Sequence, residues 1–358
     1  MKANDAMRIH TDLVKYLMRD NDNVVISPMG IQESIGALGL GAGTYTEVLI
    51  GHFILALRGK SIEDKLEWIK RRVDNCESKS LVMANLLLVG AGNTIKEDYK
   101  ERVVQYIVGA EALTVGSEED REEVIRRVRE LTDGKVEFTP SIGANGVVEC
   151  VNIINFNAKW SKDYTDADLE TGGFEGVDEE VTYICGRGHG YYSSRSAEAF
   201  MIDYKEKRFK FIGILPRKGL DEYIKNLADI DLKTIVRRMV DQEHKVDFKL
   251  PLFKIESNID LKRYFTREES YYSSIFSTNA DLSKMSRDKL FVSSMGQKNV
   301  LEVTREGTSA VSVTSWVANK LGHTQVDKIK LDRPFMFMIW DTIVNAPLFI
   351  GAVKDPTK

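Results

Sequence analysis

The sequence predicts an α+β fold that forms one domain. Segments with helical periodicity come first and β-rich segments fill about the last hundred residues, so helices and strands do not alternate. Such alternation is what a parallel sheet with crossover helices would require. The 358 residues also contain no Gly/Ser linker, low-complexity tract or internal repeat at which the chain would divide. We therefore expect a single α+β domain over residues 1–358.

The composition fits a soluble globular protein with a large core. Hydrophobic residues make up 43% of the chain and charged residues 29%. The formal net charge of −4 gives no general attraction to nucleic acid or to an anionic membrane. No apolar run is long enough to cross a bilayer, so we expect no transmembrane helix.

The N-terminus and the cysteines predict the compartment. Residues 1–5 are followed by no apolar segment of the kind that a signal peptide needs. The three cysteines are an odd number without CxxC spacing, and no Asn-x-Ser/Thr acceptor occurs. We expect a cytoplasmic protein, or one released without a classical signal peptide. Earlier removal of a leader would instead indicate secretion.

Two helices are predicted at the start of the chain. The first carries apolar residues at helical spacing, namely Ala6, Ile9, Leu13 and Leu17, and the Asn and Asp residues at 21–23 end it. Ser27 then provides an N-cap and Pro28 a first helical position, which predicts a second helix through Leu40. Its glycines indicate close packing against neighbouring backbone.

The remaining elements follow from periodicity and β-propensity. Residues 62–73 are amphipathic, and residues 81–89 are a continuous apolar run that reads as a buried strand, or a strand plus a helix end. Residues 119–131 form a charged helix with the expected pairs Glu122–Arg126 and Glu123–Arg127. We expect strands within 147–160 and 209–215 and a helix over 223–241.

Conventional enzyme motifs are absent. The five histidines show no metal-ligand spacing, and no nucleophile elbow or Walker motif occurs. Residues 186–190 (Gly-Arg-Gly-His-Gly) look like a phosphate loop, but no helix follows them, and residues 191–194 indicate a hairpin tip. We therefore expect no cofactor, no metal and no catalytic residue, and hence no enzyme.

The most informative segment begins at residues 306–310, with the sequence Glu306, Gly307, Thr308, Ser309, Ala310. Small or β-capable residues continue through Ser315, where ordinary loops carry Gly, Pro, Asn and Asp clusters. No proline lies between Pro251 and Pro334, so nothing prevents this segment from joining a β-ladder. The pattern predicts a loop that can become a strand.

This loop resembles the reactive-loop hinge of the serpins, the serine protease inhibitor family. Motifs similar to those of the family occur in family order along the chain: residues 23–31 (Asn-Val-Val-Ile-Ser-Pro-Met-Gly-Ile), 41–44, 132–136 (Thr-Asp-Gly-Lys-Val), 151–160, 250–256 (Leu-Pro-Leu-Phe-Lys-Ile-Glu), 280–283, 333–335 and 348–351. One of these motifs alone would be weak evidence for the family, whereas the complete set in the family's order is specific to it. It extends from about residue 6 to residue 356.

The resemblance implies a fold and a mechanism. The fold would have helices around a large central mixed β-sheet and smaller sheets, with an exposed reactive loop at about residues 305–325. The function would be irreversible suicide-substrate inhibition of a serine protease, by loop cleavage, acyl-enzyme trapping and strand insertion. The alternative is a non-inhibitory member that acts as a chaperone or ligand-binding protein.

The usual spacing of the family implies a reactive bond between Leu321 and Gly322. A leucine before the cut favours a chymotrypsin-like protease with an apolar primary pocket. The rival bond joins Lys320 to Leu321 and would indicate a trypsin-like protease, and a papain-like cysteine protease also accepts leucine. On insertion, Thr308, Ala310, Ser312 and Thr314 would share one face, where their small size suits a packed sheet. The bulkier Trp316 would slow the last part of insertion.

By resemblance, two further groups control sheet opening. A hydrogen-bonded cluster beneath the strands would comprise Ser27, Gly30, Asn152 and Gln297, with Gly30 in place of a usual serine and Gln297 in place of a usual histidine. Since glutamine does not titrate near neutral pH, we expect opening to depend little on mildly acidic pH. At the top of the sheet, Trp160 matches the family's tryptophan, whereas Leu252 and Arg305 replace its usual Lys–Glu pair.

The expected partner is therefore a target serine protease, bound by a monomer. Two basic clusters occur, at residues 70–72 and at Lys205, Lys207, Arg208 and Lys210. Acidic neighbours at Glu63, Asp64 and Glu67 interrupt the first cluster, so a solvated helix face is the better interpretation and glycosaminoglycan binding is not expected.

Overall fold

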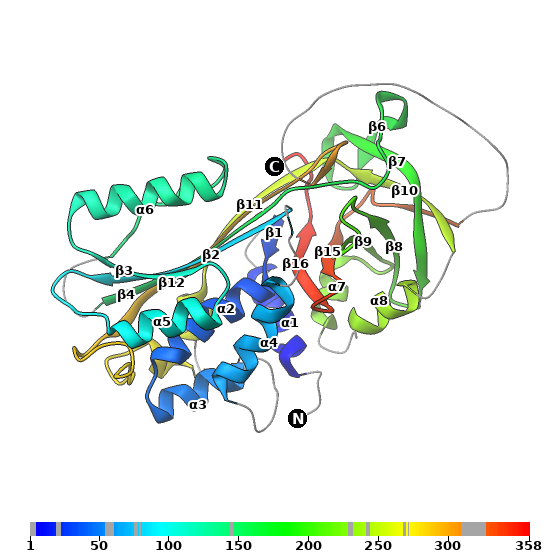
Figure 1. The fold of residues 1–358 in the computed structure, drawn as a ribbon. Coiled ribbons are helices and arrows are strands. Elements are labelled where there is room, and N and C mark those ends of the chain that lie inside the picture. The colour runs from blue at the N-terminus through cyan, green and yellow to red at the C-terminus, as the bar shows by residue number, and fades with distance from the viewer. Residues whose placement is uncertain are drawn as a thin grey trace. The chain divides into compact units, whose positions relative to one another are not determined.

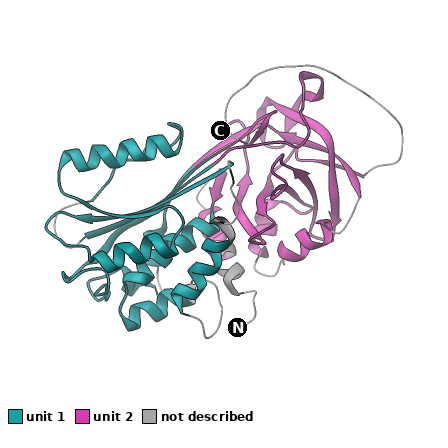
Figure 2. Ribbon diagram, in the orientation of Figure 1, with its two compact units in different colours: residues 1–10, 27–155, 257–300 teal, residues 11–26, 156–256, 301–358 magenta. Residues whose placement is uncertain are grey.

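Two β-sheets hold most of the strands in the computed structural model of the protein (Figure 1). The structure describes residues 5–18, 23–53, 61–74, 78, 80–142, 147–227, 232–240, 244–267, 270, 272–308 and 327–358. The chain forms two compact units (Figure 2). Unit 1 comprises residues 1–10, 27–155 and 257–300, and unit 2 comprises residues 11–26, 156–256 and 301–358.

Unit 1 places helices on both faces of a group of strands (Figure 1). β2 (Leu81–Gly90) pairs in parallel with β3 (Ala110–Val115), and β4 (Val147–Phe156) pairs in parallel with β12 (Phe291–Val303). The helix α6 (Glu118–Leu131) covers one face of these strands, and an apolar cluster lies between them. The other side carries α2 (Pro28–Gly41), α3 (Thr44–Phe53), α4 (Ile62–Asp74) and α5 (Glu97–Tyr106).

Most of unit 2 is one sheet of nine strands, in the order β1-β16-β15-β9-β8-β7-β10-β14 with β6 paired to β7. Its neighbours are antiparallel except for β10 and β14, which are parallel. The strands are β1 (Asn23–Ile26), β6 (Leu169–Phe174), β7 (Val177–Ser193), β8 (Ala197–Asp203), β9 (Phe209–Pro216), β10 (Lys245–Pro251), β14 (Asp327–Lys330), β15 (Phe335–Asp341) and β16 (Ala346–Val353). The buried strands β15 and β16 carry almost wholly apolar sequences, as a sheet covered on both faces requires.

The second sheet has the order β3-β2-β4-β12-β13-β5, with β11 (Phe253–Asp260) paired to β12. Two of its strands are only two residues long, β5 (Ala158–Lys159) and β13 (Gly307–Thr308). The remaining helical segments of the described chain are α1 (Asp5–Met18), the shorter helices α7 (Leu220–Lys225), α8 (Leu232–Val240) and α9 (Leu261–Phe265), and the 3₁₀ turns η1 (Asp166–Asp168) and η3 (Ser273–Phe276).

The helix α2 begins where the sequence predicts it. The Ser27 hydroxyl accepts a hydrogen bond from the Gly30 N–H at 3.2 Å, and Pro28 occupies the first turn. Every residue of this helix is buried. A side chain at Gly39 would lie 2.7 Å from Ile62, so glycine permits the close approach of α4. The helix is closely packed as predicted, but the atoms nearest to Gly30, Gly39 and Gly41 belong to side chains and not, as expected, to neighbouring backbone.

Three expectations about local structure are wrong. The helix expected over 223–241 is divided into α7, which ends at Lys225, and α8, which begins at Leu232. Asn226 leaves the helical conformation, with φ −96° and ψ 7°, and its N–H is shared between the Glu222 and Tyr223 carbonyls as in a tightened last turn. In α6, Arg127 pairs with Glu123 as expected, but Arg126 pairs with Glu123 and Glu130 instead of Glu122. Both choices are allowed because i,i+3 and i,i+4 neighbours share a helix face.

The third correction concerns the Gly-Arg-Gly-His-Gly motif. Residues 186–190 lie inside β7, and the predicted hairpin is present, but its turn to β8 falls at residues 194–196 instead of 191–194. The glycines allow close contacts: a side chain at Gly188 would lie 2.6 Å from the Met201 carbonyl oxygen, and one at Gly190 would lie 2.7 Å from that of Met239. The glycines of this motif therefore allow β7 to pack closely against neighbouring backbone.

Candidate functional site

The predicted hinge begins at a tight turn after β12. The Thr304 N–H donates to the Gly307 carbonyl oxygen at 2.8 Å, and the chain then reverses into β13. Thr308 pairs with Val303 of β12 on one side and with Ala158 of β5 on the other, antiparallel to both. Gly307 and Thr308 of the hinge therefore already form a strand between β12 and β5.

Gly307 has a steric role in this arrangement. A side chain there would place its Cβ 2.0 Å from the Ala158 carbonyl oxygen and 2.7 Å from Lys159 Cα, both of them backbone atoms. No side chain can be accommodated at that separation, so residue 307 must be glycine for β13 to lie against β5. Nothing in the sequence around Gly307 indicates this close contact, because Ala158 and Lys159 are distant along the chain.

Thr308 is fully buried, and its hydroxyl has one partner. The Thr308 and Tyr204 hydroxyl oxygens lie 2.6 Å apart, and either group can be the donor. Burial raises the pKa of the Tyr204 phenol above its ordinary value, against a smaller opposite effect of the bond to Thr308. The phenol therefore keeps its proton, and the pair satisfies two hydroxyls that would otherwise be buried without a partner.

Trp160 holds the turn that precedes β13. Its indole Nε1–H donates to the Thr304 carbonyl at 3.0 Å, and its backbone N–H donates to the Glu306 carbonyl at 3.0 Å. The indole also stacks on the Tyr204 ring, with 4.6 Å between ring centroids and 17° between planes. Trp160 thus contacts both the turn and the phenol that binds Thr308.

Arg305 and Leu252 occupy the positions where the family resemblance implies a Lys–Glu pair. Arg305 forms an ion pair with Asp166 and a second one with Glu306, the latter at 3.0 Å. Partial burial acts to raise the pKa of Glu306, but hydrogen bonds from Arg305, from its own backbone and from Thr304 outweigh it, and the pKa lies below its usual value. Leu252 donates its backbone N–H to Thr182.

Three residues of the predicted sheet-opening cluster lie together beneath the sheet. Gln297 accepts from the Ser27 N–H at 2.8 Å through Oε1, and its Nε2 donates to the Ser27 carbonyl at 2.9 Å. The same Nε2 donates to Asn152 Oδ1 at 2.7 Å, which joins β12 to β4. All three side chains are fully buried. The amide of Gln297 therefore uses both its donor and its acceptor functions.

The fourth predicted member, Gly30, takes part through its shape. A side chain at Gly30 would place its Cβ 2.0 Å from Asn152 Oδ1. Asn152 therefore fills the volume above the helix α2 that a serine at position 30 would need. Glycine at residue 30, where the family usually has serine, therefore leaves room for the Asn152 side chain.

The cluster is larger than the sequence indicated. Asn152 Nδ2 donates to Asn85 Oδ1 at 2.9 Å, and the Ser34 hydroxyl donates to the same oxygen at 3.2 Å. Asn299 Nδ2 donates to Gln297 Oε1 at 2.9 Å. Asn85 and Asn299 were not predicted. The one signal for Asn85 is a polar amide inside an otherwise apolar strand, which does not reveal its partner, and Asn299 has no such signal because β12 carries several polar residues.

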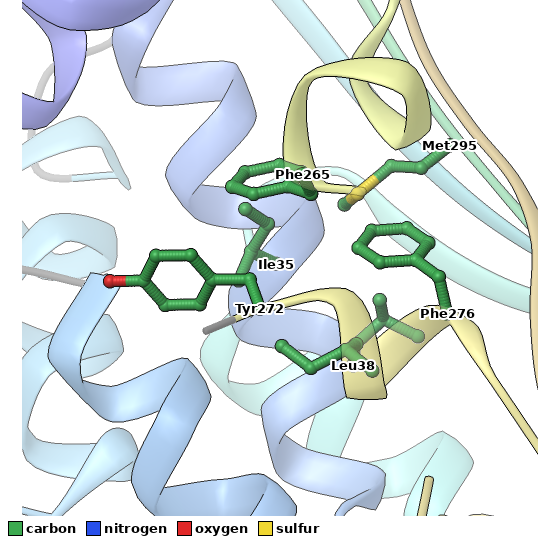
Figure 3. Close-up of a pocket in the computed structure, with 7 residues that line it drawn as sticks. Ile35, Leu38, Phe265, Tyr272, Phe276 and Met295 are labelled. Atoms are coloured by element: carbon green, nitrogen blue, oxygen red, sulfur yellow. The ribbon is translucent and has the colours of Figure 1, made fainter. Parts of the chain in front are cut away.

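An apolar pocket lies beside β12, on the face that carries the Met295 side chain. It is lined by residues of α2, α9, η3 and β12, namely Ile35, Leu38, Phe265, Tyr272, Ile275, Phe276 and Met295 (Figure 3). The cavity volume is about 10 Å³, at the limit for a single water molecule. It is therefore a packing space into which Met295 can shift, and it is too small for a ligand.

Several predicted features lie outside the described residues. Ser309 and Ala310 of the hinge, Trp316, and both candidate bonds, at Leu321–Gly322 and at Lys320–Leu321, belong to the segment 309–326. Nothing in the structure places them, and their roles stay predictions.

The second basic cluster is largely neutralised. Arg208 is buried with Asp341 at 2.7 Å, Lys210 pairs with Asp203 at 2.6 Å, and the exposed Lys205 pairs with Asp163 at 2.8 Å. Within the described part of the chain, no group of His, Cys, Asp and Glu side chains is placed to hold a metal ion. No helix among the described residues is long and apolar enough to cross a membrane.

Comparison with known proteins gives a consistent family. A model of the family "Serpin (serine protease inhibitor)" matches residues 5–356. "Alpha-1-antiproteinase 2" of Equus caballus is 27% identical over 355 residues, which are 94% of this chain and 82% of that protein.

Two solved structures are similar over 99% of this chain. The thermophilic serpin Tengpin in its native state has a TM-score of 0.86 and 25% identity, over 93% of its own chain. Thyroxine-binding globulin in complex with thyroxine has a TM-score of 0.85 and 22% identity, over 99% of its own chain, which shows the shared fold alone. The ordered motifs, the α+β architecture, the hinge strand and the matched family model lead to one conclusion: the chain belongs to the serpins, a family of protease inhibitors and not of enzymes.

Proposed function

We propose that this protein is a suicide-substrate inhibitor of serine proteases. A protease cuts the segment 309–326, and the part that follows Thr308 then enters the sheet before the acyl-enzyme is hydrolysed. The observation that carries this proposal is the position of β13, because Gly307 and Thr308 already occupy the place of an inserted strand between β12 and β5. Insertion extends a strand that has begun.

The pairing register supports continued insertion. Val303 and Ala158, on either side of Thr308, have the same offset in numbering as Asn299 and Ile154, which pair directly. A strand that continues antiparallel from Thr308 would separate these pairs one after another. In that register Thr314 falls opposite both Gln297 and Asn152, whose mutual hydrogen bond must break. The Thr314 hydroxyl can then donate to or accept from the separated amides.

Insertion would supply both stability and displacement. About 14 residues at about 3.3 Å each give a strand of about 45 Å, enough to carry an attached protease across the inhibitor. Each added residue pairs with a strand on both sides, so the cleaved form would be more stable than the intact one. The intact fold is then held by a kinetic barrier.

We assign the reactive bond to Leu321–Gly322 and therefore favour a chymotrypsin-like protease. An apolar primary pocket accepts the leucine side chain, whereas a trypsin-like protease would cut after Lys320. The protein would be incubated with chymotrypsin, trypsin and elastase, and the cut located by mass spectrometry. We expect an SDS-stable adduct with chymotrypsin and a cut after Leu321.

A Thr308→Arg variant tests insertion itself. Residue 308 is fully buried beside Tyr204, where an arginine would have no counter-charge, so the variant should be cut without forming an adduct. The intact wild type should melt well below its cleaved form. Cleavage with no adduct for the wild type and no rise in melting temperature would refute inhibition.

A small-molecule carrier is the second candidate. Unit 2 has a hollow of about 490 Å³ lined by Lys15, Met18, Asp221, Ile224, Lys225 and Lys354. Three lysines beside two apolar side chains would suit an apolar molecule with a carboxylate. Saturable binding of a fluorescent fatty acid, lost in Lys225→Glu, would favour this function if the adduct test fails.

We also propose that the two units are parts of one domain that acts as a monomer. The chain enters each unit three times, and the family model extends across both. We retain the proposal that the protein works in the cytoplasm or after release without a classical signal. Analytical ultracentrifugation would test whether the protein is a monomer, and cell fractionation would test its location.

A further inference from the structure

One face of the sheet in unit 2 is strongly basic. Along β10 the even-numbered residues are buried, so the odd-numbered ones point to the other face. Pairing places residues of β7 and β14 beside them, since Asp247 lies opposite both Arg187 and Lys328, and Lys249 lies opposite Lys330. This basic face comprises the cations Arg187, Lys245, Lys249, Lys328 and Lys330 and the carboxylates Asp247 and Glu170.

Two of the cations are neutralised and three are not. Arg187 pairs with Asp247 at 2.9 Å, and Lys249 pairs with Glu170 at 3.5 Å. Lys245, Lys328 and Lys330 are exposed and form no ion pair with any described residue. The face therefore presents a net positive field that is not compensated within the described part of the chain.

The strand β14 of the basic face begins a few residues after the predicted reactive bond, Leu321–Gly322. Asp327 is fixed by parallel pairing of β14 with Val246 of β10. Five residues lie between Asp327 and Leu321, so six Cα–Cα steps of about 3.3–3.6 Å limit the distance between them to about 22 Å. A protease of about 230 residues has a radius of gyration of about 17 Å. A protease bound at residue 321 would therefore bring its own surface near β14.

We propose that this basic face attracts an acidic surface of the target protease and accelerates the encounter. This inference rests on the proposed function, because it names the electrostatic character of the same partner. The two ion pairs favour a protein over a polyanion, because they leave only Lys245, Lys328 and Lys330 unpaired and so offer no continuous row of cations to a chain of sulfates or phosphates. Uncompensated charges of one sign raise association rates most at low ionic strength.

The probe is chymotrypsin before and after succinylation, which turns its lysine amines into carboxylates while active-site titration fixes the amount of active enzyme. The readout is the rate constant for cutting the segment 309–326, whether or not an adduct follows. For the wild type at about 10 mM salt, where the Debye length is about 30 Å, we expect succinylation to raise this constant about tenfold. The increase should vanish at about 1 M salt.

The test variant is Lys328→Glu/Lys330→Glu, which should abolish or reverse the effect of succinylation. The matched control is Lys100→Glu/Lys289→Glu, which makes the same change in net charge in unit 1 and should retain the wild-type ratio. Lys245→Glu alone provides a second variant, with a smaller loss expected, in case the double change in β14 alters folding. Circular dichroism and melting temperature check each protein.

The outcomes separate the two proposals. If both double variants show the wild-type ratio, the basic face does not recognise the protease, even where adducts form normally. If adducts never form but the charge dependence of cutting persists, inhibition fails and the recognition surface stands. Charge-independent cutting, combined with dextran sulfate binding that Lys328→Glu/Lys330→Glu abolishes, would show a polyanion site and overturn this inference.

Discussion

Asn152 fills the space that a side chain on Gly30 would occupy, because an added Cβ would lie 2.0 Å from Asn152 Oδ1. The same oxygen accepts the hydrogen bond from Gln297 that joins β4 to β12. A change at residue 30, in the helix α2, would therefore act through the Asn152 side chain on the bond between β4 and β12.

We predict that Gly30→Ser destabilises the intact protein by about 1–3 kcal/mol, the usual range for overpacking a core. The serine must displace the Asn152 amide and weaken its bond to Gln297, so insertion should also become faster. Chemical denaturation and stopped-flow fluorescence would measure the two effects. Gly173→Ser is the control, because a side chain there meets no atom within 4 Å. Equal effects of the two substitutions would refute the explanation.

The cluster beneath the sheet should be insensitive to mildly acidic pH. Ser27, Asn152 and Gln297 do not titrate, so the rate of loop insertion should be flat between about pH 5 and 7. Gln297→His should introduce a dependence, because burial disfavours the imidazolium and lowers the folded-state pKa. The unfolded state then binds more protons below about pH 6.5, so stability falls as pH falls.

The control for that prediction is a variant of Glu33, the carboxylate of α2. Glu33 is buried and accepts from the Val108 N–H at 2.8 Å, and the Val108 carbonyl accepts from Asn85. A Glu33→Gln variant that removed any pH dependence of the wild type would assign it to Glu33. A wild-type dependence that survived in Glu33→Gln would contradict the prediction for the cluster.

The Tyr204–Thr308 hydroxyl pair should stabilise the strand position of the hinge. Tyr204→Phe leaves the Thr308 hydroxyl buried without its partner, which we expect to cost about 1–3 kcal/mol. Tyr204→Phe/Thr308→Val removes both groups and should recover most of the loss. Urea denaturation of the four proteins gives the coupling energy. A coupling near zero would show that the 2.6 Å contact contributes nothing to stability.

Trp316 should slow insertion and stabilise its product. In the register set by Thr308, residue 316 falls opposite Met295 and Cys150, on the buried face. Met295 borders the small pocket beside α2, into which it can shift when the indole arrives. Trp316→Ala should therefore insert faster yet give a cleaved form that melts lower, because less apolar area is buried. If the insertion rate and the melting temperature of the cleaved form were both unchanged, Trp316 would not be inserted opposite Met295, and this prediction would be wrong.

Local sequence was sufficient for much of the fold. Ser27 and Pro28 predict the start of α2, and the spacing of small residues from Thr308 onward predicts a segment able to enter a sheet. These signals work because caps, periodicity and side-chain size act within a few residues. The position of Thr308 between Val303 and Ala158 could not be foreseen, because it depends on strands that are distant in sequence.

Long-range polar contacts were the main omission. Tyr204 lies at the end of β8, and no pattern around it indicates a bond to residue 308. Asn85 of β2 likewise bonds to Asn152 on the neighbouring strand β4, which is distant along the chain. A buried amide or phenol requires a hydrogen-bond partner, so its presence in the sequence predicts that a partner exists. Which residue is the partner depends on the register of the sheets. The family resemblance supplied Trp160 through the motif at residues 151–160, and Gln297 through its position between the motifs at 280–283 and 333–335.

The strands that follow the loop decide what becomes of the chain once it is cut. After scission at Leu321, the C-terminal piece still contains β14, β15 and β16, and the last two lie deep within the nine-stranded sheet. This piece stays bound without any covalent link, as if the molecule had become a two-chain protein. Gel filtration should register a single particle, and only a denaturant should release the smaller peptide.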